Sequence, residues 1–278
     1  MNWNTYKKHP LSLCLFVLVI LSALFTMGLL FFLVAYILIK GIPHLNLDLF
    51  AWKYTSENVS MMPAIINTIF LTVLSLLIAV PCGIGASIYL VEYAKRGNKL
   101  VKMIRLMAET LSGIPSIVYG LFGMLCFVTA LKWNYSLLAG ACTMSIMILP
   151  LILRTTEEAL LSVPDSYREA SFGLGAGKFR TIIKIVLPAA VPGILAGIIL
   201  AIGRIVGETA ALLYTSSTIP EVAESLFDPA ETLALHMWVL SGESLYTNQA
   251  YATAVVLLVV VVLINTFSAW IARKIAKQ

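Results

Sequence analysis

Residues 169–214 read EASFGLGAGKFRTIIKIVLPAAVPGILAGIILAIGRIVGETAALLY, and this segment joins a polar, glycine-rich loop to an apolar helix. The loop half contains Gly173, Gly175 and Gly177, which stop a helix from continuing. The helix half is an apolar helix that carries an arginine and a glutamate, Arg204 and Glu208, four residues apart. The two halves predict two features, a contact surface for another protein and a charged site within a membrane span.

The amino-acid composition places most of the chain in lipid. The 278 residues are 60% hydrophobic and 12% charged, with a mean hydropathy of +0.93, whereas soluble domains carry about 25% charged residues. The net charge of +5 does not indicate nucleic-acid binding, because the basic residues stand in short loops beside apolar runs. That placement is typical of contact with an anionic lipid leaflet.

The cysteines and histidines predict no metal and no cofactor. The four cysteines lie in apolar stretches without CxxC spacing, and the three histidines are scattered. Neither a disulfide framework nor a set of metal ligands has this pattern.

The apolar runs predict an all-α integral membrane protein with six transmembrane helices in a single domain, residues 1–278. A span needs about 20 apolar residues. Six stretches qualify, at residues 11–39, 65–89, 114–131, 136–153, 192–214 and 250–272. Residues 132–135 alone join the third and fourth spans, which predicts a tight hairpin. Pro81, with two glycines after it, predicts a kink or an unwound turn near the end of the second span.

The distribution of Lys and Arg predicts the orientation. With the N-terminus in the cytoplasm, the outer side holds Lys40, Lys53 and Lys132, and Arg204 lies inside a span. The other fifteen of the nineteen basic residues fall on the cytoplasmic side: Lys7, Lys8, Lys95, Arg96, Lys99, Lys102, Arg105, Arg154, Arg168, Lys178, Arg180, Lys184, Arg273, Lys274 and Lys277. The positive-inside rule therefore predicts that both termini are cytoplasmic.

Residues 154–191 form a cytoplasmic loop with an exposed apolar surface. A short helix is expected after Pro164, with Asp165 as its cap and Glu169 in its first turn. Phe172, Leu174 and Phe179 would then face the cytoplasm, and such a patch predicts docking into a groove of a partner. The alternative is an interfacial helix that rests on lipid headgroups. The run GLGAGK is not a phosphate-binding loop, because Phe179 follows the lysine and no strand precedes it.

The outer loop, residues 215–249, contains no Lys or Arg. Its five acidic residues are Glu221, Glu224, Asp228, Glu231 and Glu243. Trp238 and Tyr246 indicate that this loop lies along the membrane surface. A solvated loop is the alternative.

Arg204 and Glu208 are the charged residues of the fifth span. If that helix begins at Pro192, Arg204 lies about 18 Å in, near the middle of a core about 30 Å thick. Glu208 would share its helix face one turn later. A guanidinium there would stabilise a passing oxyanion, with Glu208 holding the arginine when the site is empty. An ion pair that only locks helices together is the alternative.

The loop resembles a motif of bacterial ABC importer permeases. Glu169-Ala170-Ser171, then Gly175, Ile185 and Leu187-Pro188, are similar to the EAA–xxx–G–x9–I–x–LP loop of that family, with Ser171 in place of its second alanine. The resemblance implies a type I ABC importer permease fold in the bacterial cytoplasmic membrane. It also implies that Glu169, Ala170, Phe172, Gly175 and Phe179 belong to a coupling loop that docks on a cytoplasmic ATPase subunit.

Three further segments resemble the permeases of phosphate-specific importers. They are RIVGETAALLYT at residues 204–215, GIPSIVYGLFG at 113–123 and LPLILRTTEEALLSVPDSYREAS at 149–171. Ala211 stands where the family often has proline. The resemblance implies that Arg204, Glu208 and Thr209 lie on the substrate path, with Arg154 at its cytoplasmic exit.

The family also implies the partners. A homologous permease chain would complete the pathway, a cytoplasmic ATPase dimer would use ATP and Mg²⁺, and an extracytoplasmic binding protein would deliver inorganic phosphate. Two other functions stay open. One is transport of another oxyanion such as sulfate or molybdate, and the other is a membrane-embedded enzyme, although Glu208 is the only carboxylate within the predicted spans.

Overall fold

The computed structural model describes residues 10–95 and 97–275, a part of the chain that forms helices and connections without a strand. Lys7, Lys8, Arg96 and Lys277, which enter the predicted orientation, lie outside it. The α-helices are α2 (Pro10–Gly41), α3 (Met62–Ile88), α4 (Lys99–Ser112), α5 (Ser116–Gly123), α6 (Leu137–Leu161), α7 (Asp165–Gly173), α8 (Lys178–Thr181), α9 (Leu187–Val206), α10 (Ala210–Leu213), α11 (Leu233–Gly242) and α12 (Thr247–Ile275). Shorter 3₁₀ or π-helical segments are η1 (Ile42–His44), η2 (Leu47–Phe50), η3 (Tyr89–Tyr93), η4 (Met124–Ala130), η5 (Ile182–Val186) and η6 (Ser244–Tyr246).

Five helical stretches of the described residues are long and apolar enough to cross a membrane. They are Leu11–His44, Met62–Tyr93, Leu137–Leu161, Lys178–Val206 and Ser244–Trp270. A sixth is bent, because Lys99–Ser112 and Ser116–Ala130 meet the same criterion together but cross at 102°. Pro115 lies in the bend with an extended ψ of 141°, and a proline disfavours helix at the residue before it. Counting the bent pair as one span gives the six predicted spans.

Two predicted span boundaries are wrong. The fifth span runs over Lys178–Val206 rather than residues 192–214, because α8, η5 and α9 follow one another without a break. The fourth continues past residue 153 to Leu161. Of the two alternatives predicted near Pro81, an unwound turn is absent, since α3 stays helical to Ile88 and passes into the π-helical η3.

α6 is the central helix, and two-thirds of the residues in its most apolar stretch are buried. α3 and α9 pack along it, and α12 packs against α9 on the other side. Glycines allow close approach at these crossings, because a Cβ on Gly83 would stand 2.7 Å from Ile152, and one on Gly197 would meet Thr155. The bundle core consists mainly of aliphatic side chains and methionines, such as Leu71, Met144 and Ile148.

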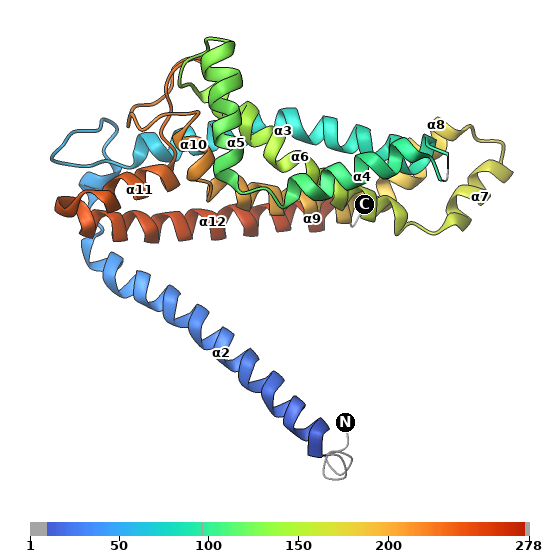
Figure 1. The fold of residues 1–278 in the computed structure, drawn as a ribbon, viewed down its shortest axis with the longest axis horizontal. Coiled ribbons are helices and arrows are strands. Elements are labelled where there is room, and N and C mark those ends of the chain that lie inside the picture. Colours follow the sequence, from blue (N-terminus) through green and yellow to red (C-terminus); the bar gives the residue numbers. More distant parts are fainter. Residues whose placement is uncertain (1–9, 96, 276–278) are drawn as a thin grey trace.

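α2 projects away from the bundle and meets it only near its last residues (Figure 1). No residue of its most apolar stretch is buried. Gly41, at its end, lies so close to Tyr251 that a Cβ would clash with the backbone of α12. The long apolar surface of α2 is therefore free to contact lipid or another chain.

The bundle has two ends (Figure 1). α7 and α8 project from one end, which we name the α7 end. At the other, the α11 end, α11 packs on α3 and on the first turns of α12.

Candidate functional site

Arg204 lies in the last turn of α9 and not at the middle of its span. The predicted depth was wrong because the helix begins at Lys178, upstream of Pro192, and ends at Val206. The arginine is half-buried, between the buried Ala201 and Ile205. It therefore stands at the α11 end of the helix, where the chain leaves helical geometry.

Glu208 does not share a helix face with Arg204, which corrects the predicted pairing. α9 stops at Gly207, and Glu208 and Thr209 form a short break before α10. The Glu208 carboxylate turns toward α10, where its Oε1 accepts a hydrogen bond of 3.1 Å from the Ala211 backbone N–H. Glu208 thus satisfies one of the backbone N–H groups at the start of α10 that have no partner within the helix.

Within the described residues, the Arg204 guanidinium makes no hydrogen bond and no ion pair. The Tyr119 hydroxyl lies near it. That hydroxyl donates a 2.8 Å hydrogen bond to the Leu111 carbonyl, across the bend between α4 and α5. An arginine offers five donors in a planar fork, so its binding capacity is open here.

The break after Arg204 packs tightly on α5. A Cβ on Gly120 would lie 2.8 Å from Cα of Ala211, so only a glycine fits this contact. Thr209 is half-buried and is the residue immediately before α10. Close backbone packing thus fixes the start of α10 against α5.

Arg154 lies apart from this group. Its Nε donates a 3.1 Å hydrogen bond to Oε1 of Glu158 on the same helix, and both side chains are more than 60% exposed. It lines an open cavity of about 280 Å³ with Arg105 and Glu157, which form an ion pair between α4 and α6. α6 continues two turns beyond Arg154, so this residue does not end the span.

α7 and α8 form a helical hairpin, residues 165–181, which we name the α7–α8 hairpin. α7 ends at Gly173, as the glycines predict, and Gly175 has a φ of +79° that favours glycine. Glu169 lies in the second turn and not the first. Glu169, Ala170, Phe172, Gly175 and Phe179 are all exposed.

The hairpin presents the apolar surface that the sequence predicts. Phe172, Leu174 and Phe179 are 46%, 90% and 71% exposed. Beside them lies an open groove of about 550 Å³, lined on its polar side by Arg180 and Lys184. The hairpin is stiffened from within, because the buried hydroxyls of Ser171 and Thr181 are hydrogen-bonded at 2.8 Å.

Sequence reasoning missed the link between this hairpin and α3. Arg168 on α7 donates to Oε1 of Glu92 from Nε at 3.0 Å and from Nη2 at 2.8 Å. The two residues are 76 positions apart, and neither stands in a pattern that singles it out. The signal in the sequence was a lone carboxylate, Glu92, just after a long apolar run.

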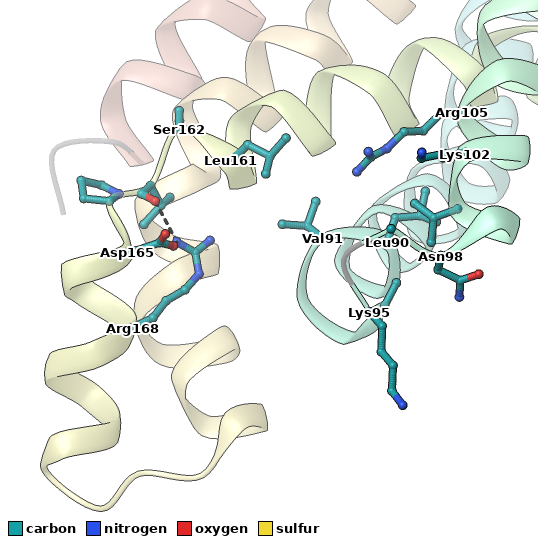
Figure 2. Close-up of a pocket in the computed structure, with 15 residues that line it drawn as sticks. Leu90, Val91, Lys95, Asn98, Lys102, Arg105, Leu161, Ser162, Asp165 and Arg168 are labelled. Carbon is teal, nitrogen blue, oxygen red and sulfur yellow. Dashed lines mark hydrogen bonds and ion pairs between the residues drawn. The ribbon is translucent and has the colours of Figure 1, made fainter.

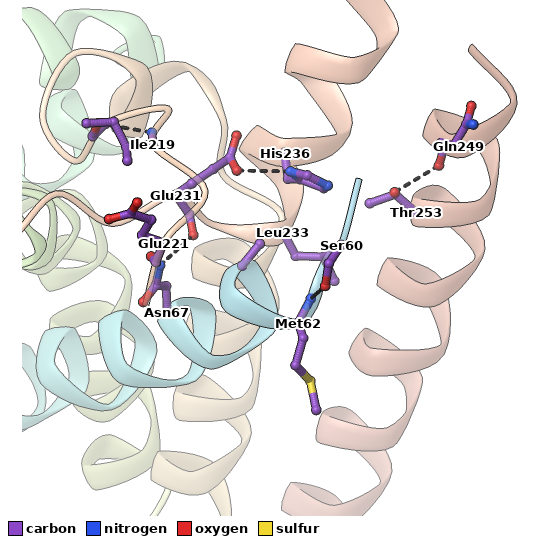
Figure 3. Close-up of polar contacts among 12 residues, drawn as sticks. Ser60, Met62, Asn67, Ile219, Glu221, Glu231, Leu233, His236, Gln249 and Thr253 are labelled. Carbon is purple, nitrogen blue, oxygen red and sulfur yellow. Dashed lines mark hydrogen bonds and ion pairs between the residues drawn. The ribbon is translucent and has the colours of Figure 1, made fainter. Parts of the chain in front are cut away.

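The outer loop is folded onto α3 rather than solvated (Figure 3). The Asn67 side chain donates to the carbonyls of Glu221 and Glu231 and accepts from the Ala223 N–H. Glu231 is buried and bonded to Nδ1 of His236 at 2.9 Å. Burial raises the pKa of the Glu231 carboxyl, and the His236 bond offsets part of that rise. Glu221, Glu224 and Glu243 stay exposed.

Among residues 10–95 and 97–275, no three His, Cys, Asp or Glu side chains gather as metal ligands would. Three features stand out in the part of the chain that the structure describes: the open Arg204 site, the exposed apolar surface of the α7–α8 hairpin and the folded outer loop. A bundle of apolar spans with these features defines a membrane-embedded transport subunit.

Residues 79–277 match the family model described as "Binding-protein-dependent transport system inner membrane component", and the chain belongs to this family of ABC importer permeases. It is therefore a multi-pass membrane protein and a transport subunit rather than an enzyme. A "Probable ABC transporter permease protein YqgI" from Bacillus subtilis (strain 168) is 33% identical, over 88% of this chain and 89% of that protein. The "Phosphate transport system permease protein PstA" of Pasteurella multocida (strain Pm70) is 35% identical, over 94% of this chain and 93% of that protein.

Two solved transporters share the fold. A chain of a bacterial alginate ABC transporter, solved with a periplasmic protein bound to an alginate pentasaccharide, aligns over 98% of both chains with a TM-score of 0.71 and 17% identity. A chain of the MetNI methionine ABC transporter, in an inward-facing conformation, aligns over 77% of this chain and 94% of that one, with a TM-score of 0.59 and 19% identity. At these identities the likeness establishes the fold alone.

Proposed function

We propose that this chain is a permease subunit of an ATP-driven importer of inorganic phosphate and forms half of the translocation pathway. The observation that carries the proposal is the open guanidinium of Arg204. Arg204 is half-buried at the end of its span, and no carboxylate among the described residues pairs with it. Its partner is then a group from outside the chain, and a guanidinium fork suits a phosphate in two-point contact.

Phosphate is favoured over other oxyanions by the relatives. Several of them are phosphate permeases of the PstA type, at 32–37% identity. The solved neighbours, which act on alginate and methionine, support the fold and not the cargo. We assign this chain to the PstA type rather than to PstC, its usual partner permease, because its outer loops are short. Transport of sulfate or molybdate is the alternative.

We assign the partner proteins to the two ends of the bundle and to the path beside Arg204. At the α7 end, Phe172, Leu174 and Phe179 form the surface on which a PstB-like ATPase dimer docks, and that dimer binds the ATP and Mg²⁺. A PstC-like chain completes the path beside Arg204. At the α11 end, the exposed carboxylates of Glu221, Glu224 and Glu243 meet basic residues of a PstS-like binding protein, since specific docking uses complementary charge. Glu231 takes no part in this contact, because it is buried with His236.

The orientation belongs to the same proposal. Basic residues gather at the α7 end, from Lys95 to Arg105 and from Lys178 to Lys184, which supports a cytoplasmic α7 end in the bacterial inner membrane. Both termini are then cytoplasmic, and Arg204 lies toward the outer half of the path. Arg154 is a weaker part of the path, because Glu158 already pairs with it.

The experiment that tests the cargo is uptake of labelled phosphate by cells that lack their own phosphate importers. The cells produce this chain with its partner subunits, and excess sulfate or molybdate is added as competitor. We expect uptake that needs every subunit and resists both competitors. Uptake that sulfate or molybdate abolishes would assign the other oxyanion, and no phosphate uptake by the assembled transporter would refute the proposal.

A further inference from the structure

The π-helical segment η3, which extends α3, contacts both arms of the α7–α8 hairpin. Its Glu92 carboxylate accepts two hydrogen bonds from Arg168 on α7, at 2.8 and 3.0 Å. The next residue, Tyr93, places its ring under Lys178 of α8, with Nζ 5.1 Å from the ring centroid. One turn of the second span is thereby joined to α7 by an ion pair and to α8 by a cation–π contact.

Arg168 also joins the hairpin to α6. Its Nη1 donates to the Val163 carbonyl at 2.8 Å and its Nη2 to the Leu160 carbonyl at 2.9 Å. Leu160 lies in the last turn of α6 and Val163 just after it, where backbone carbonyls lack helical partners. A single guanidinium thus ties α3, α6 and α7 together, and its fork geometry is what permits three directions at once.

The pair is sheltered from water, with the side chains of Arg168 and Glu92 only 13% and 8% exposed. Beside it lies a cavity of about 430 Å³ between the turn that follows α3 and the junction of α6 with α7 (Figure 2). Val91 and Asn98 line one side of this cavity, and Pro164 and Asp165 line the other. α7 packs on α8 and η5, so Arg168 is its polar link across this gap to α3.

This arrangement restricts how the hairpin can move. If α7 shifts while α3 stays, the Glu92 carboxylate and the Arg168 guanidinium separate inside the protein, where unpaired charges are costly. The lower-energy motion carries α3 and the end of α6 with α7. A π-helical turn is suited to this position, because such turns are frequent at functional sites in helices.

We propose that Arg168 and Glu92 are positioning residues that transmit movement of the α7–α8 hairpin to α3, and so tie ATP hydrolysis by the partner to transport. The inference rests on the proposed function, in which the hairpin docks on an ATPase. It adds that α3 moves with the α7–α8 hairpin, which the docking surface by itself does not indicate.

The test uses the complete transporter, with its permease pair, ATPase and binding protein, reconstituted in vesicles. The quantity measured is phosphate taken up per ATP hydrolysed. The variants are Arg168→Gln, Arg168→Lys, Glu92→Gln and the exchange Glu92→Arg with Arg168→Glu. The control is Arg105→Gln, which removes an ion pair with Glu157 at the same end of the bundle without touching the hairpin.

We expect Arg168→Gln and Glu92→Gln to hydrolyse ATP while the ratio falls about fivefold or more, the range of a typical coupling between sites. The double variant Glu92→Arg with Arg168→Glu should restore part of the phosphate taken up per ATP hydrolysed. Arg168→Lys should give an intermediate ratio, and Arg105→Gln should match the wild type. If Arg168→Gln does not assemble, Glu92→Gln and Arg168→Lys carry the same comparison. Unchanged ratios in the assembled variants, or an equal fall in Arg105→Gln, would overturn the inference.

A second readout does not depend on the cargo. Nucleotide binding to the complex should change amide hydrogen exchange across η3 in the wild type and leave it unchanged in Glu92→Gln. If wild-type vesicles took up no phosphate while this exchange difference appeared, the proposed cargo would fail and the link would stand. If phosphate uptake were normal and the exchange of η3 did not respond to nucleotide, the link would fail alone.

Discussion

The hydroxyls of Ser171 and Thr181 are hydrogen-bonded at 2.8 Å across the two arms of the α7–α8 hairpin, and both side chains are buried. Thr181 also donates to the Gly177 carbonyl at 3.2 Å. The exposed Phe172 and Phe179 therefore stand on a hairpin whose arms are fixed to each other. A docking surface of this kind can transmit force, because its two halves cannot move apart freely.

Replacement of Ser171 by Ala should loosen this hairpin. We expect the free energy of unfolding to fall by about 1 kcal/mol, the net contribution of a typical hydrogen bond. Thr181 keeps its bond to the Gly177 carbonyl. Limited trypsin digestion at Lys178 and Arg180 should then proceed faster than in the wild type. Ser166→Ala, an exposed serine of the same helix, is the control. Equal digestion rates in Ser171→Ala and the wild type would show that this bond does not stiffen the hairpin.

Replacement of Gly120 by Ala should disturb the packing between α5 and α10. The added Cβ would meet the backbone of Ala211 at 2.8 Å, and overpacking of this kind costs about 1–3 kcal/mol. Gly85→Ala is the matched control, because nothing lies within 4 Å of the added atom there. We expect a lower Tm for purified Gly120→Ala and an unchanged or higher Tm for Gly85→Ala. Equal Tm values would mean that α10 shifts without cost.

The buried pair of Glu231 and His236 predicts a pH dependence of stability. Burial raises the pKa of Glu231 above its ordinary value of 4.5, so the folded state binds its proton more tightly than the unfolded state does. The resulting stabilisation is complete below pH 4.5 and is lost as the pH rises through the folded-state pKa. Glu231→Gln has no such titration. The Tm of this variant minus that of the wild type should therefore increase as the pH is raised from about 4 toward neutrality.

A Tm difference that stays constant with pH, or that falls as the pH rises, would contradict this account of Glu231. Glu243→Gln is the control, since Glu243 is exposed at the same end of the bundle. Its Tm relative to the wild type should show no comparable trend.

The sequence predicts the span number, the exposed hairpin and the family, because these depend on long apolar runs and on a motif of fixed spacing. The sequence does not predict where a helix begins or ends when a single residue determines that boundary. Pro192 is compatible with a helix start, but Pro188 is too, and α9 begins before both. That shift moves Arg204 from the middle of the span to its end. Gly207 then separates Glu208 from the helix, which no periodicity in the sequence indicates.

Contacts between distant residues were also beyond prediction. Glu92 and Arg168 are 76 residues apart. The motif that begins at the residue after Arg168 does not indicate which residue Arg168 pairs with. Glu231 reads as one of five acidic residues in a polar loop, and only the packing of α11 on α3 buries it. The charges of a membrane protein are few, yet their pairing depends on how the spans are arranged.

The central claim is that the Arg204 guanidinium contacts phosphate on the pathway, and transport by Arg204 variants tests it most directly. Phosphate uptake is measured for wild type, Arg204→Gln, Arg204→Lys and the exposed control Lys53→Gln, at matched membrane levels of assembled transporter. Loss of a charged hydrogen bond costs about 1.5–3 kcal/mol, or about tenfold to hundredfold in rate. We predict a loss of that size in Arg204→Gln, partial recovery in Arg204→Lys and no change in Lys53→Gln. Wild-type uptake by Arg204→Gln would contradict the claim and leave Arg204 without a role in transport.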